Sequence, residues 1–429
     1  MPNTSRPTGQ KDVLIVGGGV IGFTSAYYLL KQGHAVTILD RRGAKAESCS
    51  THNAGMIVPS HFVPLAAPGM IRLGLKWMLN PESPFYIRPR PDIDLASWCW
   101  RFFRASRRER CELAIPVLRD LLVESRDLFN GLADADEIGF DLHHRGLIML
   151  CKEARTLEHE ASYAGQANQL GVEARVLDQQ ELARLDPGAR MDVAGGVYFP
   201  GDGFLTPDRF LDKLRQRVAQ LGAEIRWDSP VGDFEVDGRR ITAAMGNGRR
   251  YAADELVIAG GAWTTGLADR LGLDVPMQAG KGYSVTLTDP PALPEICSIL
   301  TEARVAVTPM DGSLRVGGTM EITGLDESVS RRRVDGIARG LERYFPQFSR
   351  ELFRGLPVWH GLRPCSPDGL PYIGRSARYD NLTIATGHAM LGLSLAPITG
   401  KMVAETIAAG TRQAEFPALL SPDRYLRGT

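Results

Sequence analysis

The sequence predicts an α/β fold, and three observations carry this prediction. A short aliphatic run at 13–16, typical of a buried parallel strand, is followed by three spaced glycines and a helical stretch from Phe23 to Lys31. A second glycine-rich turn precedes a helical stretch that ends near Ala409. The composition is ordinary for a globular protein, with 44% hydrophobic and 23% charged residues. At about 150 residues per domain, a chain of 429 residues is expected to form two or three domains.

Charge and cysteine content exclude several classes of protein. The 50 basic and 50 acidic side chains give zero formal net charge, which argues against a nucleic-acid partner because such a surface needs a basic excess. The six cysteines are scattered without a C-x-x-C pair, so we expect neither a disulfide framework nor a metal site. No run of roughly 18 apolar residues is present to span a membrane. The polar residues 1–10 lack the apolar core of a signal peptide and are expected to form a disordered tail. These features predict a cytoplasmic protein.

The first glycine loop has the spacing of a dinucleotide-binding site. Gly17 allows a tight turn, Gly19 lets the backbone approach a pyrophosphate, and Gly22 lets the helix pack closely on the strand. A second predicted strand, 35–39, ends at Asp40, whose carboxylate can accept hydrogen bonds from an adenosine ribose. This fingerprint does not separate NAD from FAD, although Asp40 disfavours the 2′-phosphate of NADP. The same loops contribute Val20, Ile21 and Arg41 as further candidates.

The middle of the chain predicts a helix and several short strands. Thr206 and Pro207 are typical of a helix start. A β-meander is expected after this helix, with a hairpin turn at 237–238, which reads Asp-Gly. A buried strand at 256–259 then runs into two glycines at 260–261. That arrangement suits a second close approach to the same ligand at the carboxyl edge of a parallel sheet.

Two motifs near the C-terminus complete this pattern. Residues 359–369 read WHGLRPCSPDG, and residues 386–397 read TGHAMLGLSLAP and precede a helix. A glycine-rich turn before a helix presents free N–H groups and the positive end of the helix dipole, which suits the anionic pyrimidine edge of a flavin. The polar loop at 50–56 can lie against an extended cofactor, and it can equally be a surface loop. Because both ends of the chain carry complementary elements, they predict one site for a large cofactor.

The segment 65–110 is expected to be mostly helical. An apolar and aromatic stretch at 95–103 is followed by four arginines, at 104, 107, 108 and 110. A basic amphipathic segment of this kind can lie on a membrane surface, and it can also be a packed helix with a solvated face. The sequence leaves both interpretations open.

Taken together, the motifs resemble the glycine oxidase and D-amino-acid dehydrogenase branch of the FAD-dependent amine oxidoreductases, the DAO family. The resemblance extends from Asp12 to about Ala409. It rests on VLIVGGGVIG, STHNAGMIVPSHFVPLAAPG, FPGDGFLTP, LVIAGGAW, KGYS, GLRPCSPDGLPYIG and TGHAMLGLSLAPITG. The second motif looks nearest to dehydrogenases of D-proline-like substrates, such as hydroxy-D-proline.

This resemblance implies a particular fold. The family has a split Rossmann-type FAD-binding domain and an α+β substrate domain built on an antiparallel sheet, an architecture called glutathione-reductase-2-like. On this basis the FAD-binding domain is expected at 11–85, 190–275 and 355–429. The substrate domain is expected at 86–189 and 276–354.

The resemblance also implies which residues bind FAD. The positions that match the family's motifs are Gly17, Gly19, Val20, Ile21, Gly22, Asp40 and Arg41 for the adenosine diphosphate part, His52, Asn53, Ala54, Gly55 and Met56 beside the flavin, Val231 at the adenine, Gly260 and Trp263 in the middle motif, and Gly387, His388, Leu391, Gly392 and Leu393 at the flavin O2 edge. His52 departs from the aromatic or small residue expected in D-amino-acid dehydrogenases. It stands where the related dimethylglycine and sarcosine dehydrogenases carry a histidine covalently linked to FAD. We therefore expect FAD, bound without a covalent link or through His52.

The implied chemistry is hydride transfer from Cα of a D-amino acid to N5 of FAD, which leaves an imine that water hydrolyses to a 2-oxo acid. Arg363 resembles the family's carboxylate-binding arginine, with a structural ion pair as the alternative. Tyr283 is expected to add a hydroxyl to the same carboxylate, or to be a packed aromatic ring. We thus expect Arg363 and Tyr283 to be catalytic. His360 and Met56 are further candidates for substrate contact, although a histidine bonded to the backbone is the commoner case.

The sequence is compatible with several functions. The expected substrate is a small or cyclic D-amino acid, such as D-proline or cis-4-hydroxy-D-proline, with a quinone or another respiratory-chain component as electron acceptor. The alternatives are an oxygen-using oxidase of the glycine or sarcosine type and the FAD subunit of a multi-subunit amine dehydrogenase. An NAD-dependent dehydrogenase would leave the C-terminal glycine motif without a purpose. A partner subunit, a homo-oligomer and peripheral contact with the cytoplasmic face of the inner membrane are also left open.

Overall fold

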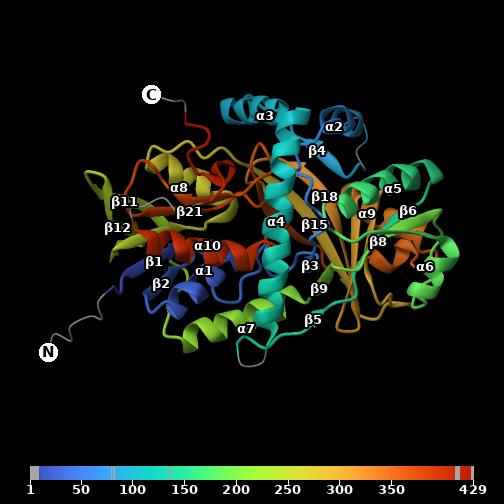
Figure 1. Cartoon of the computed structure of the whole chain (residues 1–429), viewed down its shortest axis with the longest axis horizontal. Coiled ribbons are helices and arrows are strands. Elements are labelled where there is room, and N and C mark those ends of the chain that lie inside the picture. The colour runs from blue at the N-terminus through green and yellow to red at the C-terminus, as the bar shows by residue number, and fades with distance from the viewer. Residues whose placement is uncertain (1–8, 79, 81–82, 135–136, 411–415, 427–429) are drawn as a thin grey trace.

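The computed structural model describes residues 9–78, 80, 83–134, 137–410 and 416–426. Two sheets lie side by side, and the long helix α4 (Arg108–Ala133) crosses between them (Figure 1). The disordered tail expected at 1–10 lies outside the described residues except for Gly9 and Gln10. One sheet is mostly parallel and the other mostly antiparallel, which confirms the predicted fold class.

The first sheet has six strands in the order β10-β2-β1-β14-β21-β20. These strands are β1 (Asp12–Val16), β2 (Ala35–Leu39), β10 (Glu224–Arg226), β14 (Glu255–Ile258), β20 (Tyr372–Arg375) and β21 (Leu382–Thr386). All neighbours are parallel except β20 and β21. The carboxyl ends of β1, β2, β14 and β21 therefore meet at one edge, where ligands bind in open α/β sheets.

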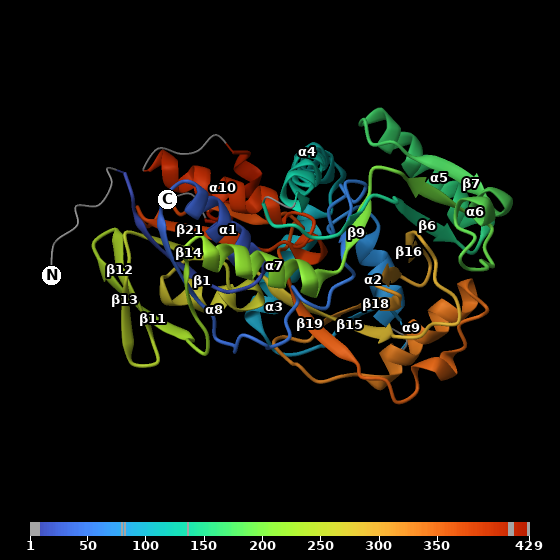
Figure 2. The ribbon, with the colours of Figure 1, turned by 90° about the horizontal axis from the view of Figure 1, so that it is seen from below.

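Both faces of this sheet are covered. On one face, α1 (Val20–Lys31), α7 (Pro207–Gln220) and α10 (Ala396–Ala409) share a core with the sheet. On the other face lie α8 (Thr264–Arg270) and a small sheet of β11 (Val231–Asp237), β12 (Arg240–Gly246) and β13 (Arg249–Ala252). The predicted helix start at Pro207 is confirmed. The predicted hairpin is present, but its turn lies one residue later than expected, at 238–239, because Asp237 still pairs with Arg240. Helices α1 and α10 lie side by side although they come from opposite ends of the chain (Figures 1 and 2).

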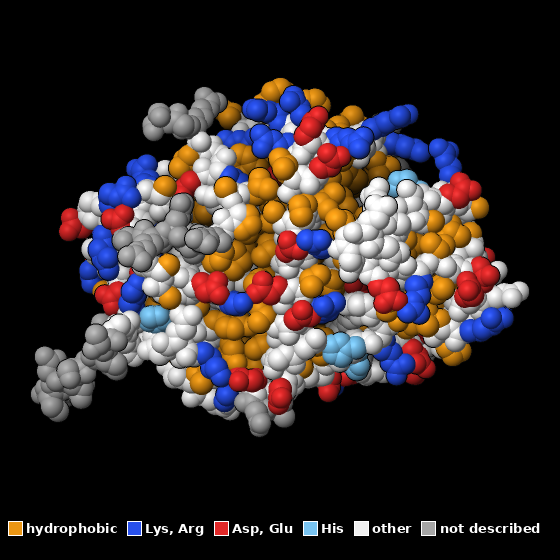
Figure 3. Space-filling view, viewed as in Figure 1, with side chains coloured by type: hydrophobic (Ala, Val, Ile, Leu, Met, Phe, Trp, Pro, Cys, Tyr) orange, Lys and Arg blue, Asp and Glu red, His pale blue; other side chains and the backbone are white. Residues whose placement is uncertain are grey.

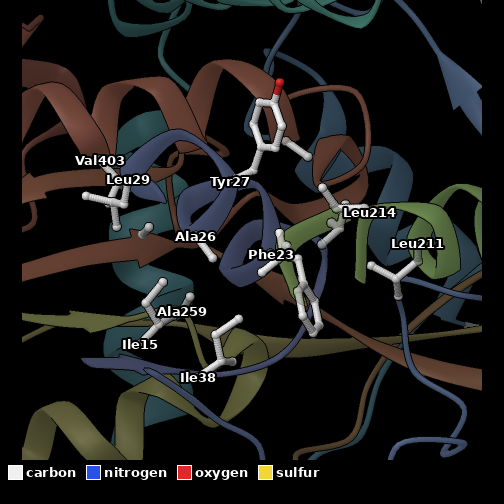
Figure 4. Packing of buried hydrophobic residues seen from close by; sticks show 14 of the residues in the cluster. Ile15, Phe23, Ala26, Tyr27, Leu29, Ile38, Leu211, Leu214, Ala259 and Val403 are labelled. Atoms are coloured by element: carbon white, nitrogen blue, oxygen red, sulfur yellow. The ribbon is translucent and has the colours of Figure 1, made fainter. Parts of the chain in front are cut away.

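Figure 4 shows how the core holds α1 against the sheet. Phe23, Ala26 and Leu29 of α1 are fully buried, as are Ile15 of β1 and Ile38 of β2. Full burial of a large apolar side chain contributes about 1.5–3 kcal/mol to stability. These contacts fix the position of the helix, and with it the loop that joins β1 to α1.

Gly22 allows this helix to approach the strand closely. A Cβ atom at Gly22 would overlap the carbonyl oxygen of Gly17. The helix begins at Val20, earlier than the expected Phe23, because Gly19 adopts an extended conformation as its N-cap and Gly22 already lies within the first turn.

The second sheet has nine strands. Eight follow the order β19-β15-β18-β17-β16-β6-β8-β7, and β4 pairs with β18. They are β4 (Phe85–Ile87), β6 (Leu147–Cys151), β7 (Arg175–Asp178), β8 (Gly195–Phe199), β15 (Gln278–Leu287), β16 (Cys297–Leu300), β17 (Val305–Met310), β18 (Ser313–Ile322) and β19 (Trp359–Cys365). Helix α9 (Arg331–Tyr344) packs on it around its own core.

The proposed domain boundaries differ from the sheet pairing at two strands. Strands β8 and β19 belong to the larger sheet, whereas the expected boundaries assign their residues to the cofactor-binding part. Strand order cannot be read from local sequence, since β19 pairs with β15 across a long stretch of chain. The division into two domains stays a proposal, with β8 and β19 better grouped with the larger sheet.

The remaining elements surround the junction of the two sheets. The helices are α2 (Met70–Met78), α3 (Ile93–Ala105), α5 (Ala154–Gln169) and α6 (Gln179–Leu185), with 3-10 turns η1 (Gly261–Trp263), η2 (Arg350–Phe353), η3 (Ala389–Leu391) and η4 (Ala418–Leu420). A small sheet joins β3 (Met56–Ile57), β9 (Gly203–Leu205) and β5 (Leu142–His143). In the part of the chain that the structure describes, no helix combines the length and apolar character needed to cross a bilayer. All six cysteines carry free thiols.

Candidate active site

A cavity of about 1400 Å³ opens at the carboxyl edge of the six-stranded sheet. Its walls come from the glycine loop after β1, from the loop at 50–56, and from β15, β18 and β19 of the larger sheet. Pockets for drug-sized ligands usually measure about 300–1000 Å³, so this cavity has room for a larger molecule. Of the residues expected to bind cofactor or substrate, those that line it are Gly17, Gly19, Val20, Ile21, Asp40, Arg41, His52, Asn53, Ala54, Gly55, Met56, Val231, Gly260, Trp263, Tyr283, His360, Arg363, His388, Leu391, Gly392 and Leu393.

Gly22 and Gly387 lie outside the lining and act through packing. Gly22 permits the close contact of α1 with β1 described above. Gly387 has a left-handed backbone conformation with φ of +80°, and a Cβ atom there would lie 2.7 Å from the Tyr372 ring. Both glycines therefore shape the backbone that other residues present to the cavity.

The glycine loop is held by hydrogen bonds to neighbouring loops. The Gly17 N–H donates to the carbonyl of Leu39 over 2.9 Å, and the Gly18 N–H donates to Asp40 Oδ2 over 2.6 Å. Asp40 Oδ1 accepts from the Arg42 N–H over 2.7 Å. Each carboxylate oxygen has a second lone pair, so Asp40 retains acceptor capacity for a ribose. The N-cap of α1, Gly19, has no side chain, and the Val20 N–H donates to Ser50 Oγ over 2.9 Å, so the other N–H groups of the first turn form a positive helix end at the cavity.

The loop at 50–56 is tied to the larger sheet. The Gly55 N–H donates to Asn53 Oδ1 over 2.8 Å, which closes a tight turn. Thr308 of β17 donates its hydroxyl to the Ala54 carbonyl over 2.7 Å, and Arg315 of β18 donates to the Asn53 carbonyl over 3.2 Å. These bonds place the backbone of this loop along the cavity wall. The loop therefore has the position expected of a cofactor-binding loop, and the alternative of a surface loop is not observed.

His52 is held from three sides. Its Nδ1 lies 2.9 Å from Thr51 Oγ1, and its Nε2 lies 3.5 Å from Glu47 Oε1. Its ring stacks on Trp359 with 5.6 Å between centroids. Burial is the largest influence on this ring and lowers its pKa, so His52 is neutral at physiological pH.

His388 is buried and neutral. Its Nε2 lies 2.9 Å from Thr399 Oγ1, at the first turn of α10. Burial lowers the pKa of His388 to about 3. The histidine therefore fixes the turn before α10 to the helix itself, and it adds no positive charge to the cavity.

Arg363 projects from β19 into space that Gly282 leaves free. A Cβ atom at Gly282 would overlap the Arg363 guanidinium. The Nη1 group donates to the carbonyl of Thr319 over 2.8 Å. Thr319 lies at an irregularity between β15 and β18 and has φ of +72°, an unusual conformation for a β-branched residue. Strained backbone of this kind is often found at functional sites.

The charge of Arg363 is uncompensated. No carboxylate among the described residues lies within ion-pair distance of its guanidinium. Burial lowers the pKa of Arg363, but arginine remains protonated in proteins. A half-buried guanidinium without a counter-ion, on the wall of a large cavity, is suited to bind an anionic ligand group.

Tyr283 differs from its expected role. Its hydroxyl donates to Glu321 Oε2 over 2.6 Å and accepts from the Ser330 N–H over 3.2 Å. Glu321 also contacts Lys281 and Arg333 in a buried cluster. The single phenolic proton is thus committed to a carboxylate, so the hydroxyl is not free to bind a substrate carboxylate. We replace the expected catalytic role of Tyr283 with a structural one.

The cavity also contains residues that the sequence did not single out. His61, Arg304 and a group of apolar side chains on α2 and α3 line its walls. His61 is bonded through Ser60 to the buried Asp202. His61 lies in the motif STHNAGMIVPSHFVPLAAPG and Asp202 in the motif FPGDGFLTP. Their place in these motifs is the one feature of the sequence that could have indicated a functional role. In the part of the chain described, no three His, Cys, Asp or Glu side chains group into a metal site.

Comparison with known proteins agrees with this geometry. The model of the family DAO, described as FAD dependent oxidoreductase, matches residues 12–406. The chain is 32% identical over 426 residues to a D-amino acid dehydrogenase of Granulibacter bethesdensis, covering 96% of this chain and 99% of that protein. It is also 32% identical over 422 residues to a D-amino acid dehydrogenase of Methylobacterium nodulans, with 97% and 99% covered.

Solved structures share the fold. The glycine oxidase of Geobacillus kaustophilus superposes with a TM-score of 0.77 at 24% identity, covering 98% of this chain and all of that one. The L-proline dehydrogenase of P. horikoshii superposes with a TM-score of 0.72 at 18% identity, covering 97% and 98%. At these identities the likeness establishes the fold alone.

The cavity fits FAD, the cofactor of the matched family. The turn after β1 lines the cavity, and side chains on Gly17 or Gly18 would overlap Ala259 or Asp40. Asp40 keeps acceptor capacity for a ribose. The turn before α10 and the loop at 50–56 line the same cavity. These residues would hold the two ends and the middle of an extended dinucleotide.

We expect FAD to be released without a covalent link. Both ring nitrogens of His52 already face protein groups, on Thr51 and Glu47. Acid precipitation of the purified protein should therefore leave the yellow colour in the supernatant. The variant His52→Gln serves as the control and should release the same amount. Colour that stays with the precipitated wild type, and is lost in that variant, would show a covalent bond.

Proposed function

The chain belongs to the DAO family of FAD-dependent oxidoreductases, and on this premise we propose that it oxidises a D-amino acid to the imine and then to the 2-oxo acid. One observation carries the proposal, which is the uncompensated Arg363 guanidinium in the cavity that fits FAD. An α-carboxylate is the ligand group that such a cation binds best. The two relatives named D-amino acid dehydrogenase support this substrate class.

The protein's part in this reaction is to orient the substrate and exclude water. Arg363 would take the substrate carboxylate in a bidentate pair, while its bond to the Thr319 carbonyl fixes the plane of the guanidinium. FAD, when bound, supplies the two-electron acceptor for the hydrogen on Cα. Neutral His52 and His388 add no positive charge that would compete with Arg363 for the carboxylate.

The walls near Arg363 favour a small or cyclic side chain. Met56, Trp359, Leu362 and Met320 line the same cavity and offer apolar surface. Contact with these apolar side chains favours an apolar substrate side chain, because burial of a charged one against them is costly. We therefore propose substrates such as D-proline or cis-4-hydroxy-D-proline, for which the first product is a cyclic imine.

An anaerobic titration tests this function. D-Proline, cis-4-hydroxy-D-proline and small D-amino acids should bleach the flavin absorbance, whereas the L-forms should not. A holoprotein that only L-amino acids bleach, or that no amino acid bleaches, would contradict the proposal. The second result would favour the alternative of an FAD subunit that needs a partner.

The same protein distinguishes the electron acceptors. We propose a quinone, so turnover with a soluble quinone should exceed turnover with oxygen. Hydrogen peroxide formed in proportion to substrate would instead support the oxidase alternative.

Substitution of Arg363 should weaken binding of the amino acid without loss of FAD. Truncating one partner of a buried charge pair costs about 2–5 kcal/mol, so Arg363→Gln should raise KM by about 100-fold. Arg363→Lys keeps the charge but loses the bidentate geometry, and an intermediate effect is expected. Arg175→Lys is the matched control, since Arg175 is exposed and paired with Glu173. An unchanged KM in Arg363→Gln would exclude Arg363 as the carboxylate ligand.

An apolar surface surrounds one mouth of the cavity. Exposed large side chains there are Leu75, Ile93, Trp100, Phe103 and Met390, with exposed fractions between 49% and 87%. Leu75, Phe103 and Met390 also line the cavity. Exposed arginines follow at 104, 107, 108 and 110, and Figure 3 shows basic and apolar side chains together over α2 and α3. We propose that this surface rests on an anionic bilayer, from which an apolar quinone reaches the cavity.

Vesicle binding tests this surface. The protein should sediment with vesicles that contain phosphatidylglycerol, and more weakly with pure phosphatidylcholine. Replacing both Trp100 and Phe103 with Ser should lower the bound fraction about tenfold or more, because each loses about 1.5–3 kcal/mol of apolar burial. Val236→Ser is the control on an exposed side chain of the β11–β12 hairpin. Equal binding of the wild type and the double variant would refute the contact.

A further inference from the structure

A chain of hydrogen bonds leads from the cavity wall to a buried carboxyl group. Ser60 and His61 follow β3, and Asp202 lies between β8 and β9. The Ser60 hydroxyl donates to Asp202 Oδ2 over 2.5 Å, and the Ser60 N–H donates to Oδ1 over 3.1 Å. Nδ1 of His61 lies 2.9 Å from the same hydroxyl. His61 and Arg363 both line the cavity, so this chain ends at the wall of the cavity in which the substrate is proposed to bind.

The proton positions follow from the donors available. A serine hydroxyl has one proton, and in Ser60 this proton goes to the carboxylate. The Ser60 oxygen must then accept from Nδ1–H of a neutral His61. A neutral imidazole carries one proton, so Nε2 keeps a free lone pair. Within the described residues, Nε2 of His61 has no hydrogen-bond partner. A basic nitrogen is thus available at the cavity wall.

Of the groups in this chain, Asp202 binds a proton more tightly than His61 because of its surroundings. Asp202 is 2% exposed, and burial raises its pKa to about 7, while Arg126 opposes this shift. Burial and the nearby Arg304 lower the pKa of His61 to about 4.

The other titratable neighbours are Tyr163 and Cys297. Tyr163 donates to the Ser60 carbonyl over 2.7 Å, and Cys297 donates to the Gly146 carbonyl over 3.4 Å. Burial raises the pKa of both groups, so both stay neutral at physiological pH and neither accepts the proton.

We propose that His61, Ser60 and Asp202 form a proton relay that removes the ammonium proton of the substrate. This inference rests on the proposed function, because an amino acid arrives as an ammonium ion and gives up hydride from Cα readily only as the neutral amine. His61 is the catalytic residue that touches the substrate. Ser60 and Asp202 act through it as positioning residues.

The relay conserves charge and protons at each step. The substrate N–H bond breaks and a bond forms from that proton to Nε2 of His61. At the same time Nδ1–H passes to the Ser60 oxygen, and the Ser60 proton passes to Asp202. The substrate becomes a neutral amine, His61 is neutral again with its proton on Nε2, and the carboxylate becomes a carboxylic acid. No buried imidazolium has to persist beside Arg304.

Nuclear magnetic resonance of the holoprotein tests the hydrogen-bond chain without turnover. The protein has eight histidines, and His61→Gln identifies the ring signals of His61. In the wild type these signals should shift as the pH passes about 7, because Asp202 ionises, although the His61 ring itself stays neutral. Asp202→Asn should abolish this shift. His159→Gln should leave it unchanged, since the His159 side chain is 84% exposed. A His61 titration that is identical in wild type and Asp202→Asn would overturn the relay.

The pH dependence of anaerobic flavin reduction tests the role in catalysis. Asp202 must be ionised to accept the proton, so the wild-type rate should fall as the pH drops below about 7. General-base catalysis usually contributes about 100-fold or more, and His61→Gln, Ser60→Ala and Asp202→Asn should each lose about this much at neutral pH. Their rates should recover toward the wild type at alkaline pH, where the substrate is already a neutral amine. A purely structural defect would lower the rate at every pH.

The outcomes separate the two proposals. A wild-type holoprotein that no amino acid reduces would overturn the proposed function. It would also overturn the relay, since the relay needs an amino acid as the proton donor. A wild type that is reduced, together with variants whose pH profiles run parallel to it, would overturn the relay and leave the proposed function standing.

Discussion

The contact between α1 and β1 sets the position of the whole site. Gly22 lets the helix approach until its backbone meets the carbonyl of Gly17, and the aliphatic core beneath it holds the two elements together. The loop between them turns at the edge of the sheet, where the Gly17 and Gly18 N–H groups donate to Leu39 and Asp40. Because β2, β14 and β21 are parallel to β1, their carboxyl ends reach the same edge. Distant glycine-rich segments are thereby brought to one cavity.

Features that depend on neighbouring residues could be predicted from the sequence. The glycine spacing, the strand before Asp40, the helix start at Pro207 and the hairpin of β11 and β12 all follow from local conformational preferences. The resemblance of the motifs then supplied the split fold, and the site residues that it named line the cavity except Gly22 and Gly387. Each of these predictions concerns a short segment, or a motif whose role does not depend on side chains far along the chain.

Features that depend on partners far along the chain could not be predicted. Tyr283 looked free to bind a substrate, but its proton goes to Glu321 on another strand. Strand β19 joins the larger sheet because it pairs with β15, although its motif belongs with the cofactor elements. Ser60 and Asp202 come from separate loops that only the small sheet of β3 and β9 brings together. Sequence proximity gives no sign of any of these pairings.

A cation at the cavity wall and a buried carboxyl group behind that wall have charges opposite to those of the carboxylate and ammonium groups of an amino acid. Arg363 provides a cation without a carboxylate partner among the described residues, and the relay from His61 ends on a buried carboxyl. The carboxyl lowers the stability of the protein. Its pKa is about 7 in the folded protein and ordinarily 3.8, so the unfolded chain ionises first and stability falls as the pH rises between these values. An asparagine would keep a hydrogen bond to Ser60 without this loss, which argues that the carboxyl is retained to receive a proton. A zwitterion placed with its carboxylate on Arg363 would need such a group for its ammonium end.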